Sequence, residues 1–145
     1  MPLEAVFWVE TTGEEPAGVG YVDQRMLPAE LVRRVARDAD EVTEAIATLA
    51  VRGAPCIGVF AAYGIALARR LASDVGAFAA AAAKIRSARP TAVNLAWAVD
   101  RVLAAEGDLL AEARAIHGEQ RAVDRALAAH GASLLGRAAT VITHC

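Results

Sequence analysis

The sequence predicts an α+β fold in which a small β-hairpin precedes a mostly helical domain. Two short β-prone runs lie near the start of the chain. Alanine makes up roughly a quarter of the residues, well above average usage, and favours closely packed helices. Through most of the remaining sequence, apolar residues recur at helical spacing. The 145 residues are enough for one ordinary domain with a sizeable core.

Charge and hydropathy exclude several classes of partner. The net charge is −2 and no basic block stands out, which disfavours nucleic-acid binding. The most apolar run, residues 56–68, is shorter than the ~20 residues of a membrane span, and the first residues lack the layout of a signal peptide. The two cysteines lack metal-ligand spacing and suggest a reducing compartment. We therefore expect a cytoplasmic protein with no nucleic-acid, membrane or metal ligand.

The first elements are expected to form a hairpin. Residues 6–9 and 19–22 are β-prone, and the segment between them contains two glycines and a proline. This pattern predicts two antiparallel strands. Residues 28–37 are compatible with a short helix or with an irregular connection, and the sequence leaves the two open.

Two helices are predicted next. Asp38, with Glu41 three residues later, forms a capping-box pattern before an amphipathic helix over residues 40–50. The following run, residues 56–68, is apolar on all sides. A helix of that kind is buried, so we expect it to be the central helix of the domain.

Three further helices complete the domain. Ser73 or Asp74 can cap a third, alanine-rich helix that ends near residue 87. Thr91 is the predicted N-cap of a fourth, and Gly107 ends it. A long charged helix follows, and Gly131 or Gly136 marks its end.

The final residues predict a strand without a partner nearby in the sequence. Residues 140–143 are β-branched and strongly β-prone. A lone strand exposes its backbone hydrogen-bonding groups and needs a sheet. Either it pairs with the distant hairpin, or the rest of its domain is missing from this chain.

A possible anion site separates the first two helices. Pro55 suits the first helical position, and Gly53 allows a sharp turn or the close approach of a ligand. The free amides of the new helix, together with the Arg52 guanidinium, suit a phosphate or another small anion. Arg89 precedes the fourth helix in a similar way. An arginine before a helix is more often a solvated surface charge, so this pattern alone does not decide between the two interpretations.

Other side chains receive structural interpretations. Cys56 is expected to be a small core residue, although its place near a helix N-terminus leaves a reactive thiol open. Tyr63 and Trp97 are expected in the core. His117 lies on a charged helix and is expected to be solvated.

Five segments, taken together in order, resemble the N-terminal part of the S-methyl-5-thioribose-1-phosphate isomerase family. They are residues 23–28 (DQRMLP), 51–58 (VRGAPCIG), 61–64 (AAYG), 89–95 (RPTAVNL) and 143–145 (THC). The resemblance implies a first domain over residues 1–136. It also implies that residues 137–145 begin a Rossmann-like second domain whose remainder is absent from this chain, with the final strand as its first strand.

The resemblance also implies a function and a set of site residues. The family converts S-methyl-5-thioribose 1-phosphate to S-methyl-5-thioribulose 1-phosphate in methionine salvage, without a metal or nucleotide cofactor, and is usually dimeric. Its substrate-binding residues carry over to Arg52, Gly53, Ala54 and Arg89, and its active-site cysteine carries over to Cys145. The family's catalytic aspartate lies beyond Cys145, so we expect this chain to be inactive alone.

Two alternatives accompany this interpretation. Ribose-1,5-bisphosphate isomerase shares the fold and the sugar-phosphate chemistry. The regulatory subunits of the translation-initiation exchange factor share the architecture but serve as assembly and sensing modules. The RGAP and RPTAVN segments of this chain favour the isomerase. A truncated, inactive product is the third possibility.

Overall fold

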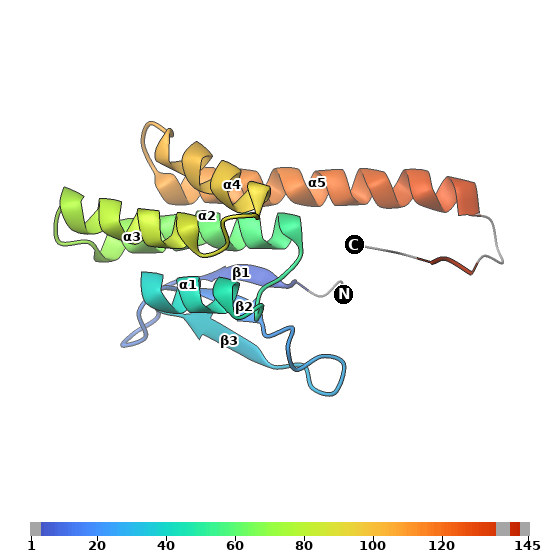
Figure 1. Ribbon diagram of the computed structural model, residues 1–145, viewed down its shortest axis with the longest axis horizontal. Helices are drawn as coiled ribbons and strands as arrows, with labels where there is room; N and C mark the ends of the chain where they lie inside the picture. The colour runs from blue at the N-terminus through green and yellow to red at the C-terminus, as the bar shows by residue number, and fades with distance from the viewer. Residues whose placement is uncertain (1–3, 136–139, 143–145) are drawn as a thin grey trace.

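A three-stranded antiparallel sheet and five helices, four of them packed around the central one, make up the computed structural model, which describes residues 4–135 and 140–142 (Figure 1). This confirms the predicted α+β class. The strands are β1 (Val6–Val9), β2 (Gly18–Val22) and β3 (Arg33–Ala36). The helices are α1 (Ala39–Ala47), α2 (Ala54–Leu71), α3 (Val75–Ser87), α4 (Val93–Leu103) and α5 (Leu109–Leu135).

The predicted hairpin is confirmed, and a third strand extends it. β2 lies between β1 and β3 and pairs antiparallel with both. β3 occupies the end of the segment that is compatible, by sequence, with a helix or an irregular connection. It starts with Arg33 and Arg34, both exposed, so it lacks the apolar alternation that would mark a strand. Pairing with β2 therefore decides its conformation.

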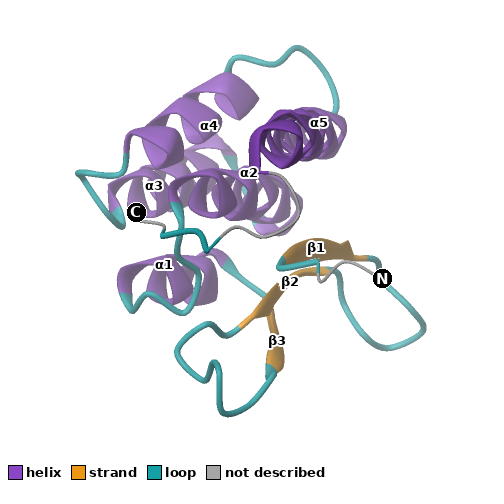
Figure 2. Cartoon of the chain, turned by 90° about the vertical axis from the view of Figure 1, so that its right-hand side faces the viewer, coloured by secondary structure: helices purple, strands orange, loops and turns teal. Residues whose placement is uncertain are grey.

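Helix α2 is the centre of the domain, as predicted. Every residue from 57 to 68 is buried, and α2 packs against the other four helices and against β1 and β2 (Figure 2). By length and composition α2 could cross a membrane, but 67% of its residues are buried inside the domain. Its apolar character is thus accounted for by the protein core.

Two predicted caps are confirmed. The Asp38 side chain accepts hydrogen bonds from the amides of Asp40 and Glu41, at 2.9 and 2.8 Å. Glu41 in turn accepts from the amide of Arg37, one residue before the cap, at 2.7 Å. Asp74, rather than Ser73, caps α3 by accepting from the amide of Ala77 at 2.8 Å. Each carboxylate satisfies backbone donors that the helix itself leaves unpaired.

The C-terminal part agrees with one of the two predicted helix ends and departs from the predicted strand. Helix α5 continues past Gly131 to Leu135, the residue before Gly136, and projects beyond the rest of the domain (Figure 1). The predicted strand is wrong over residues 140–142, which are exposed and belong to no helix or strand. No described strand pairs with these residues, and β-propensity alone does not form a strand without a neighbouring strand. The predicted boundary between residues 136 and 137 lies outside the described residues and stays a prediction.

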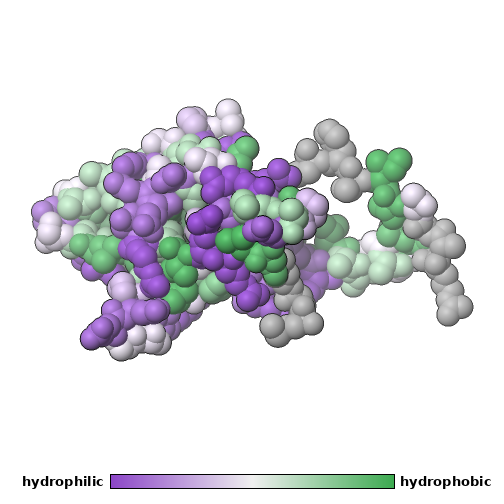
Figure 3. Space-filling model, turned by 90° about the horizontal axis from the view of Figure 1, so that it is seen from below, coloured by the Kyte–Doolittle hydropathy of each residue, from purple (hydrophilic) through white to green (hydrophobic). Residues whose placement is uncertain are grey.

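The surface on the sheet side is largely hydrophilic (Figure 3). Exposed charged side chains of β3 and α1, such as Arg33, Arg34 and Glu44, contribute to it. Apolar side chains are scattered between them, which is normal for a folded protein.

Candidate functional site

The loop between α1 and α2 turns sharply at Gly53. Val51 is fully buried and donates its amide to the Ala45 carbonyl at 3.0 Å, which fixes the entrance of the loop. Gly53 then has φ +94° and ψ 125°, a conformation that an L side chain rarely adopts. Pro55 lies in the first turn of α2, as predicted, and no side chain caps this helix. Its N-terminal amides are therefore left to a ligand or to water.

A second uncapped helix start follows Arg89. The predicted N-cap was Thr91, and this prediction is wrong: Ala92 occupies the cap position of α4. The amide of Ala92 donates to the Arg89 carbonyl at 3.0 Å, which places the cap one residue later than expected. Because alanine has no side-chain acceptor, the first amides of α4 also lack a side-chain cap.

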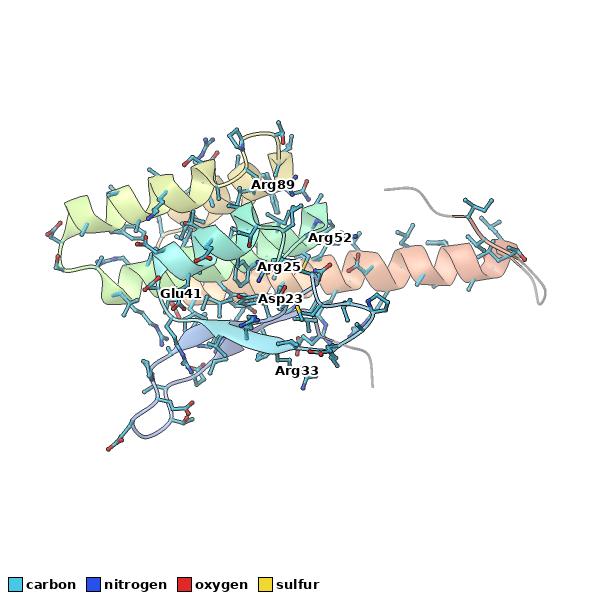
Figure 4. The ribbon with its side chains drawn as sticks, turned by 60° about the horizontal axis from the view of Figure 1, so that its bottom comes forward. Asp23, Arg25, Arg33, Glu41, Arg52 and Arg89 are labelled. Carbon is cyan, nitrogen blue, oxygen red and sulfur yellow. The ribbon has the colours of Figure 1, made fainter. Side chains whose placement is uncertain are left out.

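The two uncapped starts lie side by side. Gly58 is one turn into α2, and a Cβ added there would lie 3.0 Å from the carbonyl oxygen of Asn94 and 3.5 Å from the Cβ of Ala98. The absence of a side chain thus allows the first turns of α2 and α4 to approach closely. Figure 4 shows Arg52 and Arg89 on neighbouring loops at this end of the helix pair. Two helix N-termini therefore lie side by side, and an arginine precedes each of them.

Arg52 and Arg89 combine a place before an uncapped helix start with the lack of a described carboxylate partner. Seven of the thirteen described arginines form a salt bridge: Arg25, Arg34, Arg37, Arg86, Arg101, Arg114 and Arg121. Within residues 4–135 and 140–142, neither Arg52 nor Arg89 does. Their positive charges, added to the helix dipoles, are thus not neutralised by a described acidic side chain and favour an anionic ligand.

The turn formed by Asp23, Gln24 and Arg25 at the end of β2 is hydrogen-bonded to the Arg52 loop. Asp23 is fully buried and accepts from Arg25 and Arg34, at 2.7 and 2.9 Å. These hydrogen bonds hold the pKa of the Asp23 carboxyl far below its usual range, against the opposing effect of burial. Next to it, the amide of Gln24 donates to the Ala50 carbonyl at 2.9 Å. The Gln24 side-chain Nε2 donates to the carbonyl of Arg52 at 3.1 Å.

The sequence marks this turn as part of a motif but assigns no role to Gln24. The available signal is a polar Asp-Gln-Arg run placed directly after a buried strand. Only the structure relates it to a loop 28 residues further along the chain.

The structure brings four predicted site residues to one end of the α2–α4 pair. Arg52, Gly53 and Ala54 are exposed, and Arg89 is partly exposed. The fifth, Cys145, lies outside the described residues, so its place in the site stays a prediction.

Three other sequence interpretations have different outcomes. Burial raises the pKa of the Cys56 thiol to about 11, which argues against the reactive thiol left open above. Tyr63 is buried, as expected, and its hydroxyl lies 3.0 Å from Nδ1 of His117. The solvated assignment of His117 is therefore wrong, since its side chain is only 16% exposed. Trp97 is also not a core residue: it is 50% exposed, with the Arg101 guanidinium 5.5 Å from its ring centre.

Comparison with known proteins identifies relatives over most of the chain. The chain is 48% identical to the methylthioribose-1-phosphate isomerase of Anaeromyxobacter sp. (strain Fw109-5), over 88% of this chain and 39% of the relative. It is 46% identical to the 5-deoxyribose 1-phosphate isomerase of Moorella thermoacetica, over 88% of this chain and 41% of that protein. The chain thus spans about two fifths of the length of these relatives.

Two solved structures share the fold. The translation initiation factor eIF-2B subunit delta from A. fulgidus superposes with a TM-score of 0.66 at 34% identity, over 81% of this chain and 37% of that one. The 5-methylthioribose 1-phosphate isomerase from Pyrococcus horikoshii OT3 superposes with a TM-score of 0.62 at 32% identity, over 77% and 33%. The model of the initiation factor 2 subunit family, IF-2B, matches residues 50–145. The chain therefore belongs to the initiation factor 2 subunit family.

Proposed function

We propose that this chain is the substrate-binding first domain of an aldose–ketose isomerase. The reaction converts S-methyl-5-thioribose 1-phosphate to S-methyl-5-thioribulose 1-phosphate in methionine salvage. The observation that carries the proposal is the pair of uncapped helix N-termini, each preceded by an arginine without a described carboxylate partner. Relatives named as isomerases of this substrate, at 47–48% identity, support it.

The described residues supply binding and orientation. The phosphate sits against the first turns of α2 and α4, where backbone amides and the positive helix ends favour its negative charge. The guanidinium groups of Arg52 and Arg89 form charge-assisted hydrogen bonds to its oxygens. Gly53 and Ala54 lie next to the ligand, and the missing side chain at Gly53 allows close approach.

The chemical step needs groups beyond these. In the isomerisation the bond between C1 and the ring oxygen breaks, a hydrogen moves from C2 to C1, and the C2 hydroxyl becomes a carbonyl. The proton of the C2 hydroxyl is balanced by the proton that the released ring oxygen gains, so no net oxidation occurs. None of the residues gathered at the described site is an acid or base positioned for this transfer. Cys145 and an aspartate further along the longer protein are proposed to supply it, with the second domain closing over the phosphate.

A second sugar phosphate is also a candidate substrate. The Moorella thermoacetica relative is named as a 5-deoxyribose 1-phosphate isomerase, and both substrates carry their phosphate on C1. The described site contacts the shared phosphate end, so assays should include both sugars. The regulatory alternative, suggested by the likeness to eIF-2B subunit delta, predicts instead that neither sugar phosphate is converted.

The test is steady-state kinetics of the longer protein with Arg52→Ala and Arg89→Ala. Each substitution removes a charge-assisted hydrogen bond, so the KM for the sugar phosphate should rise about tenfold or more. Arg33→Ala is the matched control, because Arg33 is also exposed and forms no salt bridge with a described residue, but lies on β3 (Figure 4). Its KM should not change.

An unchanged KM in Arg52→Ala would remove Arg52 from the site. The 145-residue chain assayed alone should show no turnover, because the proton-transferring aspartate is not among its proposed site residues. Turnover by this chain alone would contradict the proposal that the first domain binds the substrate and the second domain supplies the groups for hydrogen transfer.

A further inference from the structure

We propose that Gln24 is a positioning residue for the phosphate site, a role that rests on the proposed function. Its side chain reaches the Arg52 loop through the hydrogen bond from Nε2 to the Arg52 carbonyl, at 3.1 Å. Its backbone amide holds the same loop two residues earlier, at the Ala50 carbonyl. Gln24 is thus bonded to both ends of the stretch that leads into Gly53.

The hydrogen bond from Gln24 also fixes the orientation of the peptide that joins Arg52 to Gly53. The carbonyl of Arg52 and the amide of Gly53 belong to one planar trans peptide, in which C=O and N–H point in opposite directions. When Gln24 holds the carbonyl, the Gly53 N–H points away from the Asp23–Arg25 turn. No described residue accepts a hydrogen bond from this N–H. The hydrogen bond from Gln24 therefore leaves the Gly53 amide available to an anion at the start of α2.

The support behind Gln24 is rigid. Asp23, its neighbour, is fully buried and fixed by two arginines, and its carbonyl accepts from the amide of Met26 at 3.2 Å. The Gln24 side chain also lies against the first turn of α2, with Nε2 4.0 Å from the sulfur of Cys56. A glycine that is free to rotate would otherwise turn its peptide in either direction. Gln24 restricts that freedom from a segment 28 residues earlier in the chain.

The test replaces the donor without changing the size of the side chain. In Gln24→Glu the carboxylate cannot donate to the Arg52 carbonyl, and Gln24→Leu removes the polar group altogether. Both variants should raise the KM for the sugar phosphate about tenfold, the factor for the loss of one hydrogen bond to a charged group. The kcat should fall less than about threefold, because the Gly53 amide binds the phosphate and not the reacting carbons.

A pH profile separates positioning from a general loss of structure. Protonation of the introduced carboxylate in the Gln24→Glu variant restores an O–H donor. The KM of this variant should therefore approach that of the unmodified protein as the pH falls towards the carboxyl pKa. The Gln24→Leu variant should show no such recovery. Gln120→Leu is the matched control: Gln120 donates to Asp124 within α5, and its loss should leave the KM unchanged.

Two failures can be told apart. If the longer protein without substitutions converts no sugar phosphate, the proposed function fails, and the role of Gln24 is then tested by the NMR signal of the Gly53 amide during titration with inorganic phosphate. That signal should shift in the unmodified protein and in Gln120→Leu, but shift much less in Gln24→Leu and Gln24→Glu. If the protein is active and the folded Gln24 variants keep its KM within twofold, or if all four proteins respond equally to phosphate, the positioning role is wrong.

Discussion

The first four of the five helices begin in two different ways. α1 and α3 start at Asp38 and Asp74, whose carboxylates accept hydrogen bonds from the first backbone amides. α2 and α4 start at Gly53 and Ala92, without a side-chain cap. Because successive helices run in opposite directions, the capped starts lie at one end of the domain and the uncapped starts at the other (Figure 1).

We propose that the capped helix starts serve stability and the uncapped starts serve binding. A side-chain cap contributes about 1 kcal/mol to stability, so each uncapped start leaves roughly that amount unused. The uncapped pair is also where two arginines stand without a described carboxylate partner, and where the loop is held by another segment, the Asp23–Arg25 turn. We infer that a bound anion accepts hydrogen bonds from the first backbone amides of α2 and α4, as the aspartate carboxylates do at α1 and α3.

The largest effect on stability should come from Asp23, the buried carboxylate in the turn that is hydrogen-bonded to the Arg52 loop. Asp23→Asn removes the charge between Arg25 and Arg34 and should lower the free energy of unfolding by about 2–3 kcal/mol, less than for a fully buried pair because the arginines are half exposed. Urea unfolding at pH 7 measures it. Asp40→Asn, which breaks an exposed pair with Lys84, should cost less than about 1 kcal/mol.

The same ion pairs predict a pH dependence. The pKa of Asp23 is lower in the folded than in the unfolded protein, so its pairs stabilise the fold above about pH 4 and this stability is lost as the pH falls further. Asp23→Asn should therefore lose less stability between about pH 5 and 2 than the unmodified protein. Equal acid sensitivity of the two proteins would contradict this assignment.

Next in size is the backbone of the Arg52 loop. Gly53→Ala meets open space, with only the Cβ of Cys56 at 3.9 Å, so its cost of about 1–2 kcal/mol arises from the positive φ alone. Gly118→Ala is the matched control, since Gly118 lies inside α5 and also faces open space. That substitution should stabilise the protein by about 0.5–1 kcal/mol. Thermal unfolding of both variants would show shifts of opposite sign.

A third variant exchanges one kind of helix start for the other. Ala92→Asp gives α4 the carboxylate that α1 and α3 have, and should raise stability by about 1 kcal/mol. The same carboxylate occupies the amides proposed for the phosphate and repels it, so the KM should rise about tenfold, equivalent to ~1.4 kcal/mol. Ala92→Asn, an uncharged cap, should give a similar gain in stability with a smaller rise in KM. A more stable Ala92→Asp variant with an unchanged KM would mean that α4 does not bind the anion.

The smallest effect is expected at the capped end. Asp38→Ala leaves the amides of Asp40 and Glu41 without their acceptor and should lower stability by about 1 kcal/mol. The KM should not change, because this start lies far from Arg52 and Arg89. A change in KM larger than twofold would show that the two ends of the domain are coupled.

Sequence reasoning predicted the capped starts better than the uncapped ones. Asp38 and Asp74 are strong cap formers placed directly before helical patterns, and their local chemistry decides the outcome. Thr91 has the same chemistry but follows Pro90, and the helix begins two residues later, after Ala92. The prediction of Thr91 as the N-cap therefore fails because the helix starts at a neighbouring residue whose side chain cannot accept a hydrogen bond.

Features that depend on distant contacts were not predictable from local pattern. The strand character of β3 comes from pairing with β2, and the burial of His117 comes from contact with Tyr63, 54 residues earlier. The role given to Gln24 depends on a loop that no local rule relates to it. The sequence singles out the two arginines because each precedes a helix start, Arg52 two residues before α2 and Arg89 four residues before α4, and their binding roles stay predictions.

The close contact at Gly58 has a consequence for ligand selection. The distance between the two arginine loops is set by how closely two helix backbones pack, 3.0 Å from a would-be Cβ to the Asn94 carbonyl. Loop residues can change in evolution without altering that spacing, whereas a single methyl group at position 58 would widen it. For the proposed anion site, this means that the core sets the spacing of the two arginine loops, while changes in the surrounding residues alter which sugar is bound without altering the space for its phosphate.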